Sequence, residues 1–133
     1  MNENQKIKIM IVDDDKFLLD MYSRKFSQKN YEPYLAIGPE MAIEKLKNKE
    51  FEPDIFLFDL IMPKMDGIEM FKIIKSENLS PNSVNIILSN QGQQSDLEKV
   101  EGLDIDGYII KALHTPTEVV EKVTEIFNNK KQK

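Results

Sequence analysis

The sequence predicts an α/β fold with a five-stranded parallel sheet covered by helices. Short runs of β-branched and aromatic residues alternate with longer stretches of helical periodicity, which is the pattern of repeated βαβ units. Polar residues follow directly on four of the apolar runs, as expected where parallel strands end at a shared crevice. The predicted strands lie near residues 6–12, 32–36, 54–58, 84–88 and 107–110.

Apolar residues at helical spacing predict helices between these strands. The first stripe consists of Phe17, Leu18, Met21, Tyr22 and Phe26. The second consists of Ala42, Ile43 and Leu46, and the third of Met70, Phe71, Ile73 and Ile74. A fourth helix, near 95–101, has only Leu97 and Val100 as apolar anchors, so we expect it to be the least stable element.

The last helix has the clearest start. Thr115-Pro116-Thr117-Glu118 matches a capping box with proline at the first helical position, where its missing N–H is not needed. The apolar residues that follow fall at i, i+1, i+4, i+7 and i+8: Val119, Val120, Val123, Ile126 and Phe127.

Composition is that of a soluble globular protein. Apolar residues make up 41% of the 133 positions and charged residues 31%, and no repeat or composition shift divides the chain. We therefore expect a single domain over residues 1–133, with a core of about 6–128 and polar tails at 1–5 and 129–133. The absence of cysteine excludes disulfides, thiolate zinc sites and cysteine nucleophiles.

Charge and hydropathy limit the partners and the location. A net charge of −5 disfavours direct binding to nucleic acid, because that affinity depends largely on basic patches. The N-terminus is polar and leads into an apolar run too short for a signal peptide or a membrane span. The sequence thus predicts a cytoplasmic protein that makes no membrane contact.

Four strand ends carry polar side chains. Asp13, Asp14 and Asp15 follow the first strand, Asp59 the third, Ser89 the fourth and Lys111 the fifth. Parallel strands end at one edge of a sheet, so these groups are expected to converge. Carboxylates together with a hydroxyl and an ammonium are typical of a site for a divalent cation and a phosphoryl group.

The acidic residues have separate interpretations. Asp13, Asp14 and Asp59 offer the oxygen ligands that Mg²⁺ prefers, and without a cation their charges would repel one another. Asp15 is interpreted as the residue that opens the next helix, where negative charge complements the helix dipole.

The segment after the third strand resembles a known signature. Asp59-Leu60-Ile61-Met62-Pro63-Lys64-Met65-Asp66-Gly67 is similar to the signature of response-regulator receiver domains of the CheY-like family. Three further motifs occur in family order and at family spacing: Val12-Asp13-Asp14, Ile87-Leu88-Ser89, and Asp106-Gly107-Tyr108 with Lys111. The resemblance covers essentially the whole chain.

The resemblance implies a fold and a set of roles. The fold would be a doubly wound, flavodoxin-like sheet with strand order 2-1-3-4-5. Asp59 would accept a phosphoryl group from a histidine kinase or a phosphotransfer protein, and Ser89 and Lys111 would contact phosphoryl oxygens. Asp13, Asp14, Asp59 and the backbone carbonyl of Ile61 would hold Mg²⁺.

The same resemblance implies a signalling role. Tyr108 matches the family's switch aromatic, although a half-buried strand tyrosine explains it equally well. The chain would change its binding of an unidentified downstream protein through the fourth strand, fourth helix and fifth strand, as a monomer or a phosphorylation-dependent dimer. It would not be an enzyme beyond catalysing its own phosphorylation and dephosphorylation.

Three positions depart from the family pattern. Ala112 stands where the family usually has a proline, often joined to the lysine by a cis peptide bond. A cis bond to a non-proline residue costs about 2.5–4 kcal/mol, so the Lys111-Ala112 loop is expected to be trans or strained. Asn90 replaces a small residue, and Ile61 is apolar where many relatives are polar.

Two alternatives stay open from the sequence. One is a pseudo-receiver that acts as a constitutive interaction domain: the retained acidic residues and Lys111 argue against it, whereas Asn90 and Ala112 keep it open. The other is a magnesium-dependent phosphohydrolase of the haloacid-dehalogenase type, because Asp13-x-Asp15 resembles that family's nucleophile motif. Phe17 does not fit that motif, and this reading leaves Asp59 unexplained.

Overall fold

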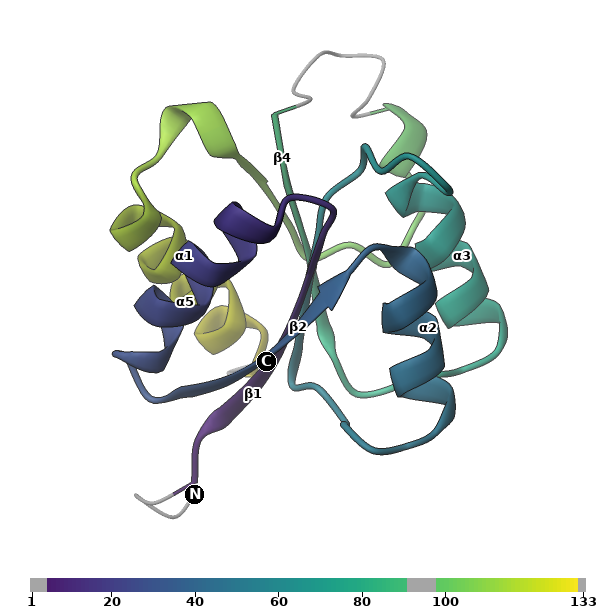
Figure 1. Ribbon diagram of the computed structural model, residues 1–133, viewed down its shortest axis with the longest axis horizontal. Helices are drawn as coiled ribbons and strands as arrows, with labels where there is room; N and C mark the ends of the chain where they lie inside the picture. Colours follow the sequence, from purple (N-terminus) through teal and green to yellow (C-terminus); the bar gives the residue numbers. More distant parts are fainter. Residues whose placement is uncertain (1–4, 91–97, 132–133) are drawn as a thin grey trace.

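A computed structural model describes residues 5–90 and 98–131 and contains a parallel five-stranded sheet. Its strands are β1 (Ile7–Asp13), β2 (Tyr31–Ile37), β3 (Ile55–Phe58), β4 (Val84–Ser89) and β5 (Gly107–Ile110). Its helices are α1 (Lys16–Ser27), α2 (Pro39–Lys47), α3 (Gly67–Ser76) and α5 (Pro116–Lys131), with a 3₁₀ turn, η1, at Lys111–Leu113. The strand order is β2-β1-β3-β4-β5, as the resemblance implied (Figure 1).

The predicted strands agree with the observed ones to within one residue at each end. Of the predicted fourth helix, residues 98–100 are helical, and residues 95–97 lie outside the described part of the chain.

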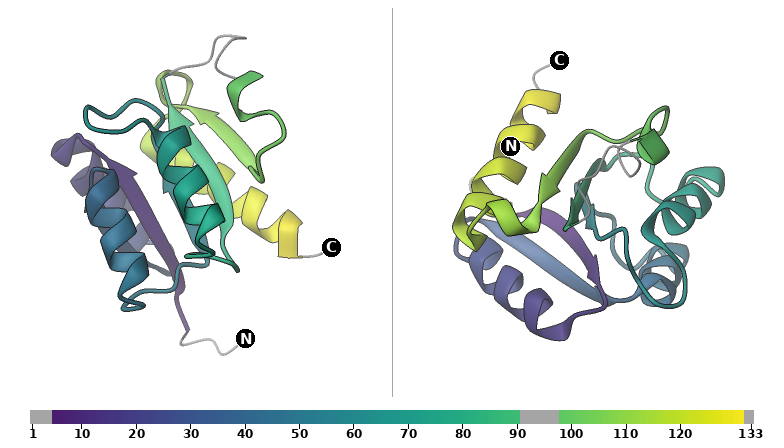
Figure 2. Two further views of the ribbon diagram at one scale, coloured as in Figure 1. Left: turned by 90° about the vertical axis from the view of Figure 1, so that its right-hand side faces the viewer. Right: turned by 90° about the horizontal axis from the view of Figure 1, so that it is seen from above.

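The helices form two layers, one on each face of the sheet (Figures 1 and 2). Side chains of β1 alternate between them: Ile9 and Ile11 pack into the core under α1 and α5, whereas Met10 and Val12 pack into the core under α2 and α3. The central strands β1, β3 and β4 are therefore buried on both faces over most of their length, which explains their nearly continuous apolar runs. Across the described residues, no helix has the length and apolar character needed to cross a membrane.

The predicted stripe of α1 is wrong at its first residue. Phe17 is 88% exposed, and the residues that face the sheet are Leu19, Tyr22 and Phe26. A helix turns by about 100° per residue, so Phe17 lies roughly 200° from Leu19 around the axis. Phe17 also sits in the first turn of α1, at the edge of the sheet where β1 has already ended.

Two helix starts were predicted correctly. The Asp15 carboxylate accepts hydrogen bonds from the backbone N–H groups of Phe17 and Leu18, and so caps α1. At α5, Thr115 N–H donates to Glu118 Oε1 at 2.8 Å, and Glu118 N–H donates to Thr115 Oγ1 at 3.1 Å. This reciprocal pair is the predicted capping box.

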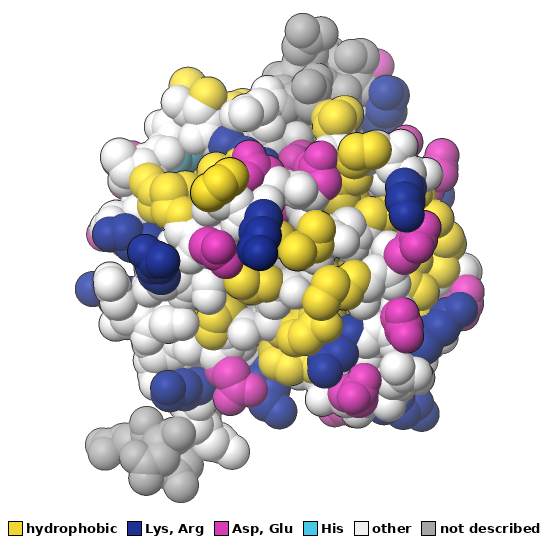
Figure 3. All heavy atoms as spheres, in the orientation of Figure 1, with side chains coloured by type: hydrophobic (Ala, Val, Ile, Leu, Met, Phe, Trp, Pro, Cys, Tyr) yellow, Lys and Arg dark blue, Asp and Glu magenta, His cyan; other side chains and the backbone are white. Residues whose placement is uncertain are grey.

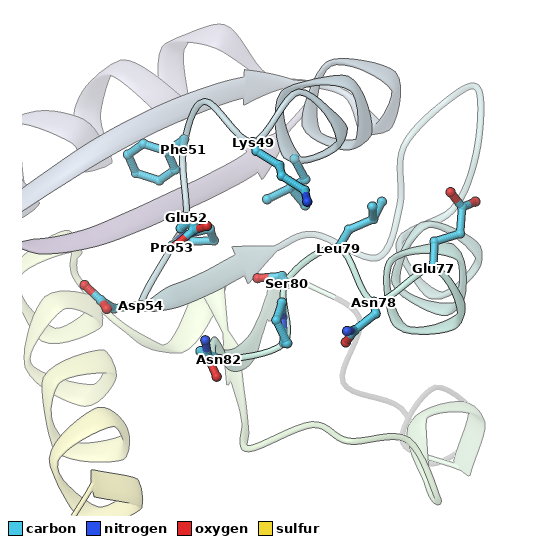
Figure 4. A pocket seen from close by; sticks show the side chains of 12 residues that line it. Lys49, Phe51, Glu52, Pro53, Asp54, Glu77, Asn78, Leu79, Ser80 and Asn82 are labelled. Carbon is cyan, nitrogen blue, oxygen red and sulfur yellow. The ribbon is translucent and has the colours of Figure 1, made fainter.

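The sheet has two edges of different character. Strands end at the carboxyl edge and begin at the amino edge. A cavity of about 530 Å³ lies at the amino edge, between the loops that follow α2 and α3 (Figure 4). Its lining includes Lys49, Phe51, Leu79 and Asn82 but none of the predicted site residues. The site residues predicted from the sequence lie at the opposite edge, where the strands end.

We expect Thr115→Ala to lower the free energy of unfolding by about 1 kcal/mol, because one orphan N–H at the start of α5 loses its acceptor. Thr117→Ala is the matched control, since Thr117 lies in the same turn and takes no part in the capping bonds. Urea unfolding of both variants measures the difference. Equal losses in the two variants would contradict the capping role.

Candidate functional site

The carboxyl edge brings together residues from four strands. Asp13 ends β1, Asp59 follows β3, Ser89 ends β4 and Lys111 follows β5. Adjacent strands are in parallel register, with Val12 beside Phe58 and Ser89 beside Ile110. The strand ends are therefore level, and the polar groups share one edge as the sequence predicted.

Three carboxylates form the acidic centre of this edge. One oxygen each from Asp13, Asp14 and Asp59 lies within 4.8 Å of the other two. Asp13 is 4% exposed and Asp59 is 8% exposed, whereas Asp14 faces solvent. Two of the three charges are therefore largely removed from water, which is costly unless a cation lies nearby.

Lys111 supplies one cation. Its Nζ lies 2.6 Å from Asp13 Oδ2 and 3.0 Å from Asp59 Oδ2, and the lysine side chain is only 9% exposed. Because the ammonium binds a carboxylate from each of two strands, it ties the end of β5 to the ends of β1 and β3. Removing one partner from such a buried cluster leaves an uncompensated charge.

The pKa shifts show that one lysine does not balance the cluster. Burial raises the pKa of Asp13, and the hydrogen bond from Lys111 only partly opposes this effect. For Lys111, burial acts to lower the pKa, but the contacts with Asp13 and Asp59 outweigh it and raise the pKa overall. The lysine thus stays charged, while the Asp13 carboxylate is disfavoured by burial and by the charge of Asp59.

Backbone groups fix the two buried carboxylates. Asp13 Oδ1 accepts from Asp15 N–H at 3.0 Å, and Asp59 Oδ1 accepts from Ile61 N–H at 3.3 Å. The chain beyond Asp59 is held in turn by α3, because Gly67 N–H donates to the Leu60 carbonyl at 2.7 Å. A Cβ at Gly67 would overlap the Asp59 carbonyl oxygen, so only glycine permits this approach.

The donor set suits a hard divalent cation. The three side-chain candidates are carboxylates, two of them on buried residues, and their oxygens lie close enough to share one ion. An acidic triad of this kind can bind a metal, and Mg²⁺ fits its oxygen chemistry.

The other residues singled out from the sequence differ in how deeply they are buried. Ser89 is fully buried, and Tyr108 is partly buried against the core under α2 and α3. Ile61, two residues after Asp59, is exposed. Among the described residues no peptide bond is cis, so the bond between Lys111 and Ala112 is trans.

Sequence reasoning missed an apolar ring around the acidic cluster. Large exposed hydrophobic residues of the described chain all lie at the carboxyl edge, either where a strand ends or in the first turn of a helix: Phe17, Ile37, Met41, Ile61 and Leu113. Figure 3 shows acidic side chains near the upper edge with hydrophobic side chains on both sides. Only folding brings these positions to one edge, because they come from four separate segments of the sequence: Phe17, Ile37 with Met41, Ile61 and Leu113.

Comparison with known proteins gives one consistent result. The family model described as response regulator receiver domain matches residues 9–124. A CheY-like receiver domain protein from Methanospirillum hungatei is similar over 96% of this chain and 98% of its own, with 26% identity and a TM-score of 0.82. The chemotaxis response regulator CheY4 of Vibrio cholerae aligns over 91% of this chain and 98% of its own, with 19% identity and a TM-score of 0.80.

We expect Gly67→Ala to destabilise the protein by about 3 kcal/mol, because the new methyl group would overlap the Asp59 backbone and overpacking has this order of cost. Gly102→Ala is the control: Gly102 has a φ of +86° but no atom within 4 Å of an added Cβ. It should cost only about 1 kcal/mol, from its left-handed backbone. Urea unfolding would contradict the close-approach argument if the two losses were equal.

Proposed function

This chain belongs to the response regulator receiver domain family, and we propose that Asp59 accepts a phosphoryl group from a histidine kinase or a phosphotransfer protein. Receiver domains are phospho-acceptor modules of two-component signal transduction rather than catalytic enzymes, and they interact with histidine kinases. The phosphohydrolase reading of Asp13-x-Asp15 is thereby set aside. In agreement, the Asp15 carboxylate is engaged in capping α1.

The observation that carries the proposal is the charge of the carboxyl edge. Three carboxylates face one ammonium, which leaves a formal charge of −2 (three negative and one positive). A phosphoryl group would bring further negative charge to the same place. A divalent cation on Asp13, Asp14, Asp59 and the Ile61 carbonyl would neutralise both, as phosphoryl transfer requires.

The transfer itself needs few protein groups. An oxygen of the Asp59 carboxylate forms a bond to phosphorus as the bond from the donor histidine nitrogen breaks, and the imidazole leaves with the electron pair. Lys111 Nζ lies 3.0 Å from Asp59 Oδ2 and would pair with a phosphoryl oxygen. Ser89 ends β4 on the same edge and would donate its hydroxyl hydrogen to another. Bound Mg²⁺ would neutralise charge spreading over the phosphoryl oxygens.

The apolar ring supports a protein donor. Phe17, Leu113 and Ile61 are exposed and lie at the same edge of the sheet as the acidic centre. Exposed apolar surface of this kind marks protein interaction sites, and here it borders the acceptor. A helical donor protein would bury the ring while presenting its phosphohistidine to Asp59.

Output would pass through β4 and β5. Ser89 and Lys111 both bind the phosphoryl group in this proposal, and Tyr108 lies on β5 between the core and the surface. Pulling Ser89 and Lys111 toward Asp59 would shift the population of conformations of residues 98–103 and of Tyr108, and so alter the binding of a downstream protein. We place this signalling in the cytoplasm.

Asp59→Asn should abolish phosphorylation while preserving the fold, because the amide is nearly isosteric but is not a nucleophile. The measurement is intact mass after incubation with acetyl phosphate and Mg²⁺. Asp66→Asn, at the start of α3, is the control that should still gain one phosphoryl group. A phosphorylated Asp59→Asn protein would refute the assignment, and an unlabelled wild type would favour a pseudo-receiver.

Asp13→Ala and Asp14→Ala should each weaken Mg²⁺ binding by about tenfold or more, since even residues behind metal ligands have effects of this size. Calorimetric titration of the unphosphorylated protein measures the affinity. Asp20→Ala removes an exposed carboxylate of α1 and controls for net charge. Wild-type affinity in both test variants would place the metal elsewhere.

A further inference from the structure

Asn85 is a buried polar residue that the proposed chemistry does not use. It is 2% exposed and lies in β4 between the apolar residues Val84 and Ile86. A buried primary amide is costly unless it is hydrogen-bonded, and apolar residues fill the other interior positions of this strand. Its presence near the amino edge, far from the acidic cluster, therefore needs a structural reason.

The hydrogen bonds of Asn85 join β4 to the segment that leads into β5. Asn85 Nδ2 donates to the Asp104 carbonyl at 3.1 Å, and Asn85 Oδ1 accepts from Ser83 Oγ at 2.7 Å. Asn85 backbone N–H donates to Asp106 Oδ2 at 2.8 Å, and Asp106 N–H donates to the Asn85 carbonyl at 2.7 Å. The Asp106 carboxylate thus takes the place of a backbone carbonyl, and the hydrogen bonding between β4 and β5 extends to the residue before β5.

Helices on both faces of the sheet bind the same segment. Lys75 of α3 contacts Asp104 Oδ2 at 2.9 Å, and Lys130 of α5 contacts Asp106 Oδ1 at 3.0 Å. The Lys75–Asp104 pair is exposed and contributes little on its own, whereas the Lys130–Asp106 pair joins an exposed ammonium to a carboxylate side chain that is only 11% exposed. The buried bonds of Asn85 are stronger, because leaving one such group without a partner costs about 1–3 kcal/mol. We call Asn85, Asp104 and Asp106 the β5 anchor.

The position of β5 depends on this anchor. β5 has four residues and is paired only with β4, with Gly107 beside Ile86 and Ile110 beside Ser89. Asp106 immediately precedes the strand, and Lys111 immediately follows it. If β5 slipped by one residue relative to β4, Lys111 would move by about 3.3 Å and every β5 side chain would turn to the opposite face of the sheet. Lys111 could then not keep both of its carboxylate contacts.

We propose that Asn85 is a positioning residue for phosphoryl transfer, acting through Asp104 and Asp106 to fix β5 and hold Lys111 between Asp13 and Asp59. The catalytic part of this statement rests on the proposed function, because it assumes that Lys111 pairs with the phosphoryl group. The positional part does not, since the Lys111 contacts are present in the unphosphorylated structure. The two parts can be tested separately.

The positional test uses the ¹⁵N signal of the Lys111 ammonium, identified by its loss in Lys111→Met. Asn85→Val keeps a residue of similar size that suits a strand, but removes the side-chain bonds. We expect the slowly exchanging signal of the wild type to shift or disappear in Asn85→Val. Tyr31→Phe, which removes a 2.6 Å hydrogen bond to Thr124 at the opposite side of the sheet, should leave it unchanged. The same signal in Asn85→Val as in the wild type would overturn the proposal.

A second pair of variants guards against failure of Asn85→Val to fold. Asp106 is more accessible than Asn85, so its replacement disturbs the core less. Asp106→Asn retains an oxygen that can accept from Asn85 N–H, whereas Asp106→Ala does not. We expect the wild-type Lys111 signal in Asp106→Asn and its loss in Asp106→Ala. An unchanged signal in both would refute the anchor.

The catalytic test is a double-mutant cycle on the rate of phosphorylation by acetyl phosphate at saturating Mg²⁺. Asn85→Val should slow the reaction about tenfold in the wild type but by less than about twofold in Lys111→Met, because its effect passes through Lys111. Equal slowing in both backgrounds would show a general structural effect. If Asp59 gains no phosphoryl group even in the wild type, the proposed function fails, while the ammonium signal still decides the positional part.

Discussion

The ion cluster of Lys111 with Asp13 and Asp59 is the interaction on which the rest of the site depends. Its three members come from the ends of three strands, so it forms only when β1, β3 and β5 end at the same level. Burying these charges costs free energy, in agreement with the raised pKa of Asp13, of which burial is the main cause. The fold thus holds negative charge that one lysine does not balance, and this imbalance suits the edge to a divalent cation.

Most of the fold was predictable because its signals are local. Strand limits, the capping box of α5 and the cap at Asp15 depend on residues that are neighbours in the sequence. Phe17 was assigned wrongly because apolar spacing alone does not reveal which face a helix turns toward the sheet. Leu19, not Phe17, completes that face, and only the packed position of α1 distinguishes them.

The site was predictable in composition but not in its contacts. Parallel strands bring their ends together, so the convergence of the acidic residues with Lys111 followed from the sequence. The 2.6 Å contact of Lys111 with Asp13 did not, because it depends on the register of a four-residue strand. The apolar ring and the β5 anchor were also missed, since each is assembled from distant segments. Asn85, a polar residue inside an apolar run, was a local signal of the anchor.

The two edges of the sheet differ in how well their charges are balanced. At the amino edge, the amide of Asn85 is bonded at both its nitrogen and its oxygen, and two lysines bind the segment that precedes β5. At the carboxyl edge, carboxylates outnumber the one ammonium that binds them. If Asp59 accepts a phosphoryl group as proposed, the added charge would act on this cluster. If β5 is also fixed at its start by the proposed anchor, a pull on Lys111 would not be relieved by sliding the strand, and would pass instead to the side chains beside it and to residues 98–103.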